Sequence, residues 1–103
     1  MFLAAPKIIC DQVFARDLSL KVGATIAFEV NIRGYPRPNV SWFVGNTKLE
    51  DSSRVSVEVR EGASSLKVRS VTGEDAGTYK VMAENALGLD TATFKVIVKG
   101  NIR

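Results

Sequence analysis

Two stretches of this chain decide its fold: residues 28–42 read FEVNIRGYPRPNVSW, and residues 75–81 read DAGTYKV. In the first stretch, apolar and polar residues alternate as far as Ile32, a segment with one glycine and two prolines follows, and Trp42 ends the run. Alternation with a period of two is typical of a strand with one buried face. Glycine and proline interrupt strands. The first stretch therefore predicts two strands joined by a loop, with Val30 and Trp42 facing inward.

The same alternation recurs along the whole chain and predicts further short strands. The alternating residues that we expect to mark these strands are Leu18 and Leu20; Ile26, Phe28, Val30 and Ile32; Val40, Trp42 and Val44; Val55, Val57 and Val59; Leu66 and Val68; Tyr79, Val81 and Ala83; and Phe94, Val96 and Val98. Ile8 and Ile9 are expected on a preceding strand, and Lys48-Leu49 on a short one. Turns are expected at residues 45–46 and 85–88, and a hairpin at residues 60–65. Evenly spaced short strands without a helical period indicate two antiparallel sheets packed face to face.

Length and composition describe one small soluble domain. With 103 residues, the chain can bury about two-thirds of its unfolded surface in a single core. The net charge is only +3 and the basic residues are spread out, which argues against nucleic-acid or membrane partners. No stretch approaches the roughly 20 apolar residues of a membrane span. We expect the domain to cover residues 6–99, with residues 1–5 and 100–103 as flanking linkers.

The positions of Val30, Trp42, Tyr79 and Val81 carry a family resemblance. In immunoglobulin domains a strand-C tryptophan packs on a disulfide between strands B and F, and a corner tyrosine lies two residues before the second cysteine. Trp42 and Tyr79 fit that pattern, whereas valines stand at both cysteine positions. With GYPRP before the tryptophan and AENALG at residues 83–88, the chain resembles an intermediate-set (I-set) immunoglobulin domain, an all-β sandwich, here without the inter-sheet disulfide.

The missing disulfide bears on the compartment. A disulfide contributes about 2–5 kcal/mol to a small secreted domain, and a buried valine about 1.5–3 kcal/mol. Val30 and Val81 can therefore replace much of that stabilisation where thiols stay reduced, which predicts a cytoplasmic domain. Asn39-Val40-Ser41 matches the N-glycosylation pattern and keeps an extracellular domain as the alternative. Cys10 has no partner within the chain and is expected to be a small hydrophobe on or near the first strand.

The sequence offers little for catalysis, and we expect neither enzyme activity nor a cofactor. It contains no histidine, only one cysteine and no phosphate-binding glycine motif. Glu74-Asp75 is the one acidic pair near a recognisable motif, and it could be catalytic or calcium-binding. The family resemblance instead implies a structural ion pair between Asp75 and Arg54, with the guanidinium gripping the carboxylate bidentately. It also implies that the Tyr79 hydroxyl returns to the backbone at the corner.

The resemblance extends to disulfide-free I-set domains of giant muscle proteins, such as titin, twitchin and myosin-binding protein C. It implies a structural and protein-binding module located in the sarcomere and associated with the thick filament. The implied partners are neighbouring immunoglobulin or fibronectin-type domains and myosin filament components. The alternatives are an extracellular adhesion or receptor domain, and a regulatory domain beside a kinase. The candidate partner-binding residues are Arg33, Tyr35, Arg37 and the hairpin at Glu61 to Ser64.

Overall fold

The computed structural model describes residues 3–10 and 18–100, and strands dominate both ranges. The strands are β1 (Ala4–Cys10), β2 (Leu18–Lys21), β3 (Ile26–Tyr35), β4 (Asn39–Val44), β5 (Thr47–Lys48), β6 (Val55–Arg60), β7 (Ala63–Val68), β8 (Gly77–Asn85) and β9 (Gly88–Lys99). A short 3-10 helix, Gly73–Asp75, precedes β8. The described residues contain no helix that is long and apolar enough to cross a membrane.

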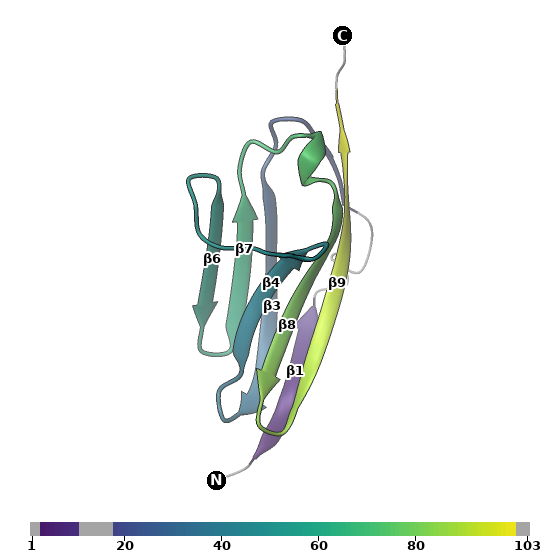
Figure 1. Ribbon diagram of the computed structural model, residues 1–103. Helices are drawn as coiled ribbons and strands as arrows, with labels where there is room; N and C mark the ends of the chain where they lie inside the picture. The colour runs from purple at the N-terminus through teal and green to yellow at the C-terminus, as the bar shows by residue number, and fades with distance from the viewer. Residues whose placement is uncertain (1–2, 11–17, 101–103) are drawn as a thin grey trace.

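These strands form two sheets, which confirms the predicted immunoglobulin-like sandwich. One sheet has the order β1-β3-β7-β6 and the other the order β2-β9-β8-β4-β5. Among the described strands, every pairing is antiparallel except that of β2 with β9, which is parallel. The parallel pair arises because the chain leaves the first sheet after β1 and joins the second at β2. Consequently β1 begins at one end of the molecule and β9 finishes at the other (Figure 1).

Side chains from both sheets meet in a core built on four aromatic rings. The Phe28 ring lies parallel to that of Phe94, with 4.5 Å between centroids, and Trp42 stacks 6.5 Å from each of them. Tyr79 is tilted against Phe28 at 6.2 Å. Such aromatic pairs contribute about 0.5–1.5 kcal/mol beyond the burial of their area. The rings therefore join the sheets at their centre, and aliphatic residues fill the space around them.

The structure corrects some element boundaries. The strand that we ended before Gly34 continues to Tyr35, because Ala4 pairs with Tyr35. This pairing also places Ala4 in β1, although the sequence alone assigned it to a flank. Gly34 permits the close approach, since a Cβ atom there would lie 3.1 Å from the Cα atom of Pro6, at a φ of +143°. The predicted hairpin at residues 60–65 is shorter, because β6 and β7 enclose only Glu61 and Gly62.

Candidate functional site

The residues at the centre of the family pattern are buried together in the core. Val30 is 1% exposed, and Trp42 and Val81 are fully buried. Trp42 on β4 lies opposite Val81 on the neighbouring strand β8, whereas Val30 comes from β3 in the other sheet. Apolar packing thus occupies the region between the sheets where the resemblance would place a disulfide.

A buried serine, Ser64, supports the tryptophan, although the sequence analysis placed it in the hairpin offered for partner binding. Trp42 Nε1 donates a hydrogen bond of 2.9 Å to Ser64 Oγ, and Ser64 Oγ donates one of 2.7 Å to the carbonyl of Glu58. Ser64 is fully buried and lies opposite Val30 in the β3–β7 register. The alternation of the strand could have predicted this burial, because Ser64 lies two residues before Leu66 and four before Val68, which both face the core.

Arg54 and Asp75 meet at one end of the sandwich, at the corner that leads into β8. Arg54 Nη2 lies 2.6 Å from Asp75 Oδ2, and the side chains are 44% and 17% exposed. The same carboxylate oxygen accepts a 2.8 Å hydrogen bond from the N–H of Thr72, which caps the 3-10 helix. The expected bidentate grip is wrong, because Arg54 Nε donates instead to the carbonyl of Arg69 at 3.2 Å.

The corner tyrosine completes this cluster. Tyr79 Oη donates a 2.5 Å hydrogen bond to the backbone carbonyl of Asp75. Burial of the phenol, reinforced by the Asp75 carboxylate and opposed by Arg54, raises the pKa of Tyr79 to about 12. The hydrogen bond and the charge of Asp75 raise the pKa of Arg54. Tyr79 therefore stays neutral and Arg54 charged near neutral pH, which suits a structural corner and not a proton-transfer site.

The described residues show no arrangement for metal binding. No group of three or more Asp, Glu, His or Cys side chains in residues 3–10 and 18–100 could hold an ion. In the same ranges, every buried side-chain nitrogen and oxygen atom has a hydrogen-bond partner. Asp75, half of the acidic pair singled out in the sequence, is engaged by Arg54 and Thr72.

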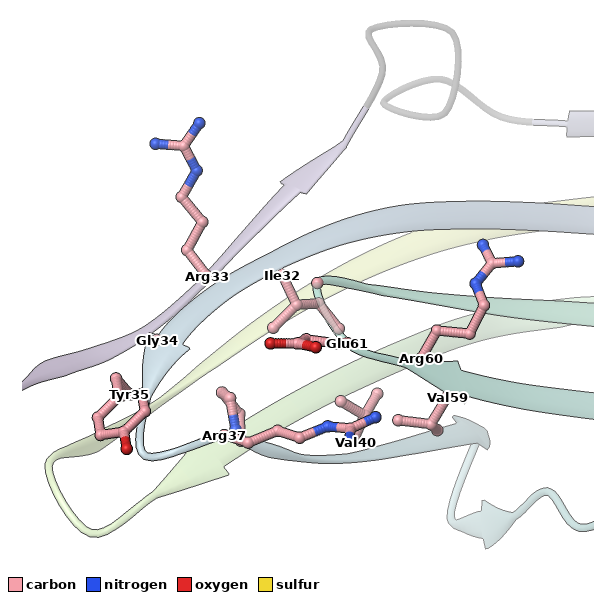
Figure 2. Close-up of a pocket in the computed structure, with 11 residues that line it drawn as sticks. Ile32, Arg33, Gly34, Tyr35, Arg37, Val40, Val59, Arg60 and Glu61 are labelled. Atoms are coloured by element: carbon pink, nitrogen blue, oxygen red, sulfur yellow. The ribbon is translucent and has the colours of Figure 1, made fainter.

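Most of the candidate partner-binding residues line one groove of about 330 Å³ at the end of the sandwich opposite the Arg54 corner. Ser64, the last residue of the predicted hairpin, is wrong as a contact residue, because it is fully buried in β7. Arg33, Tyr35 and Arg37 contribute to it from the β3–β4 side, and Glu61 and Gly62 from the β6–β7 turn. Figure 2 shows the Arg37 side chain extending along the groove, whereas Arg33 points away from it. The tertiary structure thus brings two segments together that the sequence offered separately.

An asparagine holds the loop beside this groove. Asn85, at the end of β8, donates through Nδ2 to the carbonyls of Pro36 and Ala4, each at 2.9 Å. Its Oδ1 accepts from the N–H of Leu87 and shapes the turn into β9. Asn85 was part of the quoted family motif, and the structure gives the physical reason for its position.

Two further residues bear on the cellular setting. Asn39, the potential glycosylation acceptor, is exposed as the first residue of β4. Cys10 ends β1 and lies opposite Val30 in the backbone register, but its side chain is outside the described residues.

The two-sheet topology agrees with comparisons to known proteins. The model of the immunoglobulin I-set domain matches residues 10–98. This chain belongs to the immunoglobulin I-set family.

Curated relatives of this I-set domain include muscle proteins. It is 31% identical over 83 residues to the muscle M-line assembly protein unc-89 of Caenorhabditis elegans, covering 81% of this chain and 1% of that protein. It is 32% identical over 87 residues to the smooth-muscle myosin light chain kinase of Gallus gallus, covering 84% of this chain and 5% of the kinase. The I-set domain therefore spans only a small part of these relatives.

Solved titin structures share the fold. A chimeric titin Z1Z2 carrying an exogenous decorin peptide superposes with a TM-score of 0.87 at 32% identity, covering 98% of this chain and all of that one. A domain in the complex of titin M10 with an immunoglobulin domain of obscurin-like 1 gives a TM-score of 0.85 at 27% identity, covering 97% of this chain and 99% of that one. The I-set domain is thus similar to muscle immunoglobulin domains in sequence and in structure.

Proposed function

We propose that this I-set domain is a non-enzymatic structural and protein-interaction module of a modular sarcomeric protein associated with the thick filament. It acts as a link that carries tension in a tandem array, and it works in the cytoplasm. The observation that carries the proposal is the parallel pairing of β2 with β9, near opposite ends of the described chain. The similarity to unc-89 and titin supports the muscle setting.

The β2–β9 pair suits tension because of its direction. A pull at the two chain ends draws β2 toward its own start and β9 toward its own end. In a parallel pair these pulls slide the strands past one another, so several hydrogen bonds are loaded together. Leu18 to Lys21 pair with Val96 to Lys99, and the N–H of Val22 adds a bond of 3.2 Å to the carbonyl of Lys99. The expected result is resistance to force followed by abrupt unfolding.

Neighbouring domains of the same chain and other sarcomeric proteins are the proposed partners. The exposed groove that contains Arg37 and the Glu61–Gly62 turn is the proposed contact surface. The complex of titin M10 with an obscurin-like 1 domain supports pairing between domains of this fold.

Single-molecule pulling tests the mechanical role. A tandem of identical copies of the 103-residue chain should give discrete force peaks, each followed by extension of about 3.3–3.6 Å per unfolded residue. Gradual extension without peaks would contradict the role in tension. A fluorescent fusion expressed in striated muscle cells should form sarcomeric stripes, whereas a diffuse signal would contradict the placement.

Two alternative functions are each supported by one observation. A regulatory domain beside a kinase is favoured by the similarity to myosin light chain kinase, and kinase motifs in the flanking sequence would support it. An extracellular adhesion or receptor domain is favoured by the exposure of Asn39, and a glycan on Asn39 in the protein isolated from its tissue would support it.

A further inference from the structure

Along the side where β4 of one sheet faces β6 of the other, the space between the sheets is covered over only half of its length. The connection from β5 to β6 closes one half, because Leu49 packs on the core and the following residues bind the edge of β6. Ser52 Oγ accepts from the N–H of Val55 at 3.2 Å, and Asp51 Oδ1 accepts from the N–H of Val57 at 2.7 Å. The other half of this side leads into the groove beside the β6–β7 turn.

The edge of β4 has unused backbone groups in that open half. The carbonyl of Trp42 accepts from the N–H of Leu49, so the peptide groups of Trp42 face outward from β8. Peptide groups alternate in direction along a strand, so those of Val40 face the same way. The short strand β5 pairs only with Phe43 and Val44. Among the described residues, none forms a hydrogen bond with the outward-facing peptide groups of Val40.

Apolar side chains line the groove beside this edge. Val59 follows Val55 and Val57 at the same parity and is 43% exposed, although those two pack against the core. Ile32 and Val40 add apolar surface from the facing sheets. Figure 2 shows Val40 and Val59 close to the Arg37 side chain. The groove thus combines an apolar lining with a strand edge.

The charge of the groove is positive. Its lining includes three arginines and one glutamate. Arg60 is already paired, with Glu29 at 2.6 Å and Glu58 at 3.9 Å. Arg37 forms no ion pair with any of the residues that the structure describes, and its side chain extends along the groove. Glu61 also lines the groove but forms no ion pair with Arg37. A negatively charged ligand that contacts Arg37 would therefore supply an ion-pair partner that this guanidinium lacks among the described residues.

We propose that this groove binds an extended acidic segment of a partner protein. The segment adds a strand to the free half of the β4 edge, places an apolar side chain on Val40 and Val59, and pairs a carboxylate with Arg37. Strand addition takes its affinity from backbone hydrogen bonds and its specificity from alternate side chains. This inference rests on the proposed role as an interaction module and specifies the chemistry of the partner.

Titration with a synthetic peptide of alternating glutamate and valine, about six residues long like a typical strand, tests the proposal by amide NMR. Shifts are expected at Val40, Val59 and Gly62, and none at Val22 and Lys99 at the opposite end. Absence of shifts at the groove up to millimolar peptide would overturn the proposal, as would shifts confined to other surfaces.

A matched pair of variants tests the charge. Arg37→Glu should weaken binding by about tenfold, corresponding to roughly 1.4 kcal/mol, because it turns an attraction into a repulsion. Lys95→Glu makes the same change in net charge at an exposed position of β9 that does not line the groove, so its effect should stay within about twofold. Equal losses in both variants would show general electrostatic attraction and overturn the site. A peptide with lysine in place of glutamate should not bind.

Backbone methylation of the peptide tests strand addition without altering the protein. A peptide N-methylated on every glutamate and another N-methylated on every valine should differ sharply in affinity, because only one alternate set of N–H groups faces β4. Equal affinities would exclude strand addition. The pulling experiment is independent of the groove. A domain that resists force but ignores the peptide contradicts only this inference, and one that binds the peptide but extends without a peak contradicts only the mechanical role.

Discussion

At the scale of single residues, the core depends on one polar contact as well as on apolar packing. Trp42 is fully buried, and its indole N–H would be unsatisfied without Ser64. A buried donor without a partner costs about 1–3 kcal/mol. The serine thus allows the largest core side chain to lie fully inside the sandwich.

Truncation of Trp42 should be among the most damaging single changes. Trp42→Ala removes a ring that stacks with Phe28 and Phe94, and we expect a loss of about 3–5 kcal/mol in the free energy of unfolding. Chemical denaturation measures this loss. A value below about 1 kcal/mol, within the range of ordinary surface substitutions, would show that Trp42 is not central to the core.

Ser64→Ala should lower the free energy of unfolding by about 1–3 kcal/mol, because it leaves Trp42 Nε1 without its acceptor. The matched control is a double-mutant cycle with Trp42→Phe, which removes the indole donor. In the Trp42→Phe background, Ser64→Ala should cost clearly less. Additive losses would mean that the hydrogen bond contributes nothing specific.

Tyr79 should make stability depend on alkaline pH. Its folded-state pKa of about 12 exceeds the ordinary value of 10.0, so the unfolded chain loses the phenolic proton first. The stabilisation is fully present below about pH 10 and is lost as the pH rises toward 12. Tyr79→Phe has no phenol at this position to lose a proton. As the pH rises from about 10 toward 12, the natural protein should therefore lose free energy of unfolding relative to this variant. A constant difference would contradict the raised pKa.

A spectroscopic titration checks the same pKa directly. The chain has two tyrosines, so Tyr35→Phe leaves Tyr79 as the only phenol. The phenolate absorbance of this variant should rise near pH 12 while the domain remains folded. A midpoint near 10 in the folded protein would contradict the buried environment of Tyr79.

At the scale of elements, the most important feature is that the first two strands, β1 and β2, belong to different sheets. β1 joins one sheet and β2 the other, and only β2 forms a parallel ladder with β9. The sequence predicted both strands, the first from Ile8 and Ile9 and the second from the alternation of Leu18 and Leu20. It did not show that β2 runs parallel to β9, because the direction of a pairing depends on where the chain crosses between sheets.

Leu20→Pro should lower the unfolding force of the domain. Val22 donates toward β9, so the N–H of Leu20 faces β9 by alternation, and proline removes that donor. Leu20→Ala is the control, because it trims the partly buried side chain but keeps the N–H group. Pulling should give a clearly lower peak for the proline variant than for the alanine variant. Equal forces would show that the β2–β9 ladder does not set the resistance.

At the scale of the whole molecule, stability rests on packing without a cross-link. The chain contains one cysteine, so an intrachain disulfide is impossible. Val30 and Val81 are buried in the core in place of the bridge. The isolated domain is therefore expected to be a monomer whose fold does not depend on redox conditions.

Reducing agent should leave the melting temperature of the monomer unchanged, because Cys10 has no thiol partner within the chain. Thermal melts with and without reductant, combined with a measurement of mass in solution, check this expectation. A substantial drop on reduction would reveal an intermolecular disulfide that supports the fold, and it would weaken the argument for a reducing compartment.

The sequence by itself determined the class of fold and the core. Burial selects apolar residues at every second position of a strand, so alternation identified Val30, Trp42, Tyr79 and Val81 without knowledge of distant contacts. The pairing of Arg54 with Asp75 followed only from the family resemblance, since no local pattern joins residues so far apart in the chain.

Only the tertiary structure decided what depends on contacts between distant segments. It paired Trp42 with Ser64, set β2 parallel to β9, and split the donors of Arg54 between Asp75 and Arg69. It also brought the β3–β4 loop and the β6–β7 turn to one groove. The physical reason is that hydrogen bonds and grooves require atoms at defined separations, and a one-dimensional pattern of polarity specifies which face is buried but not which distant residue lies opposite.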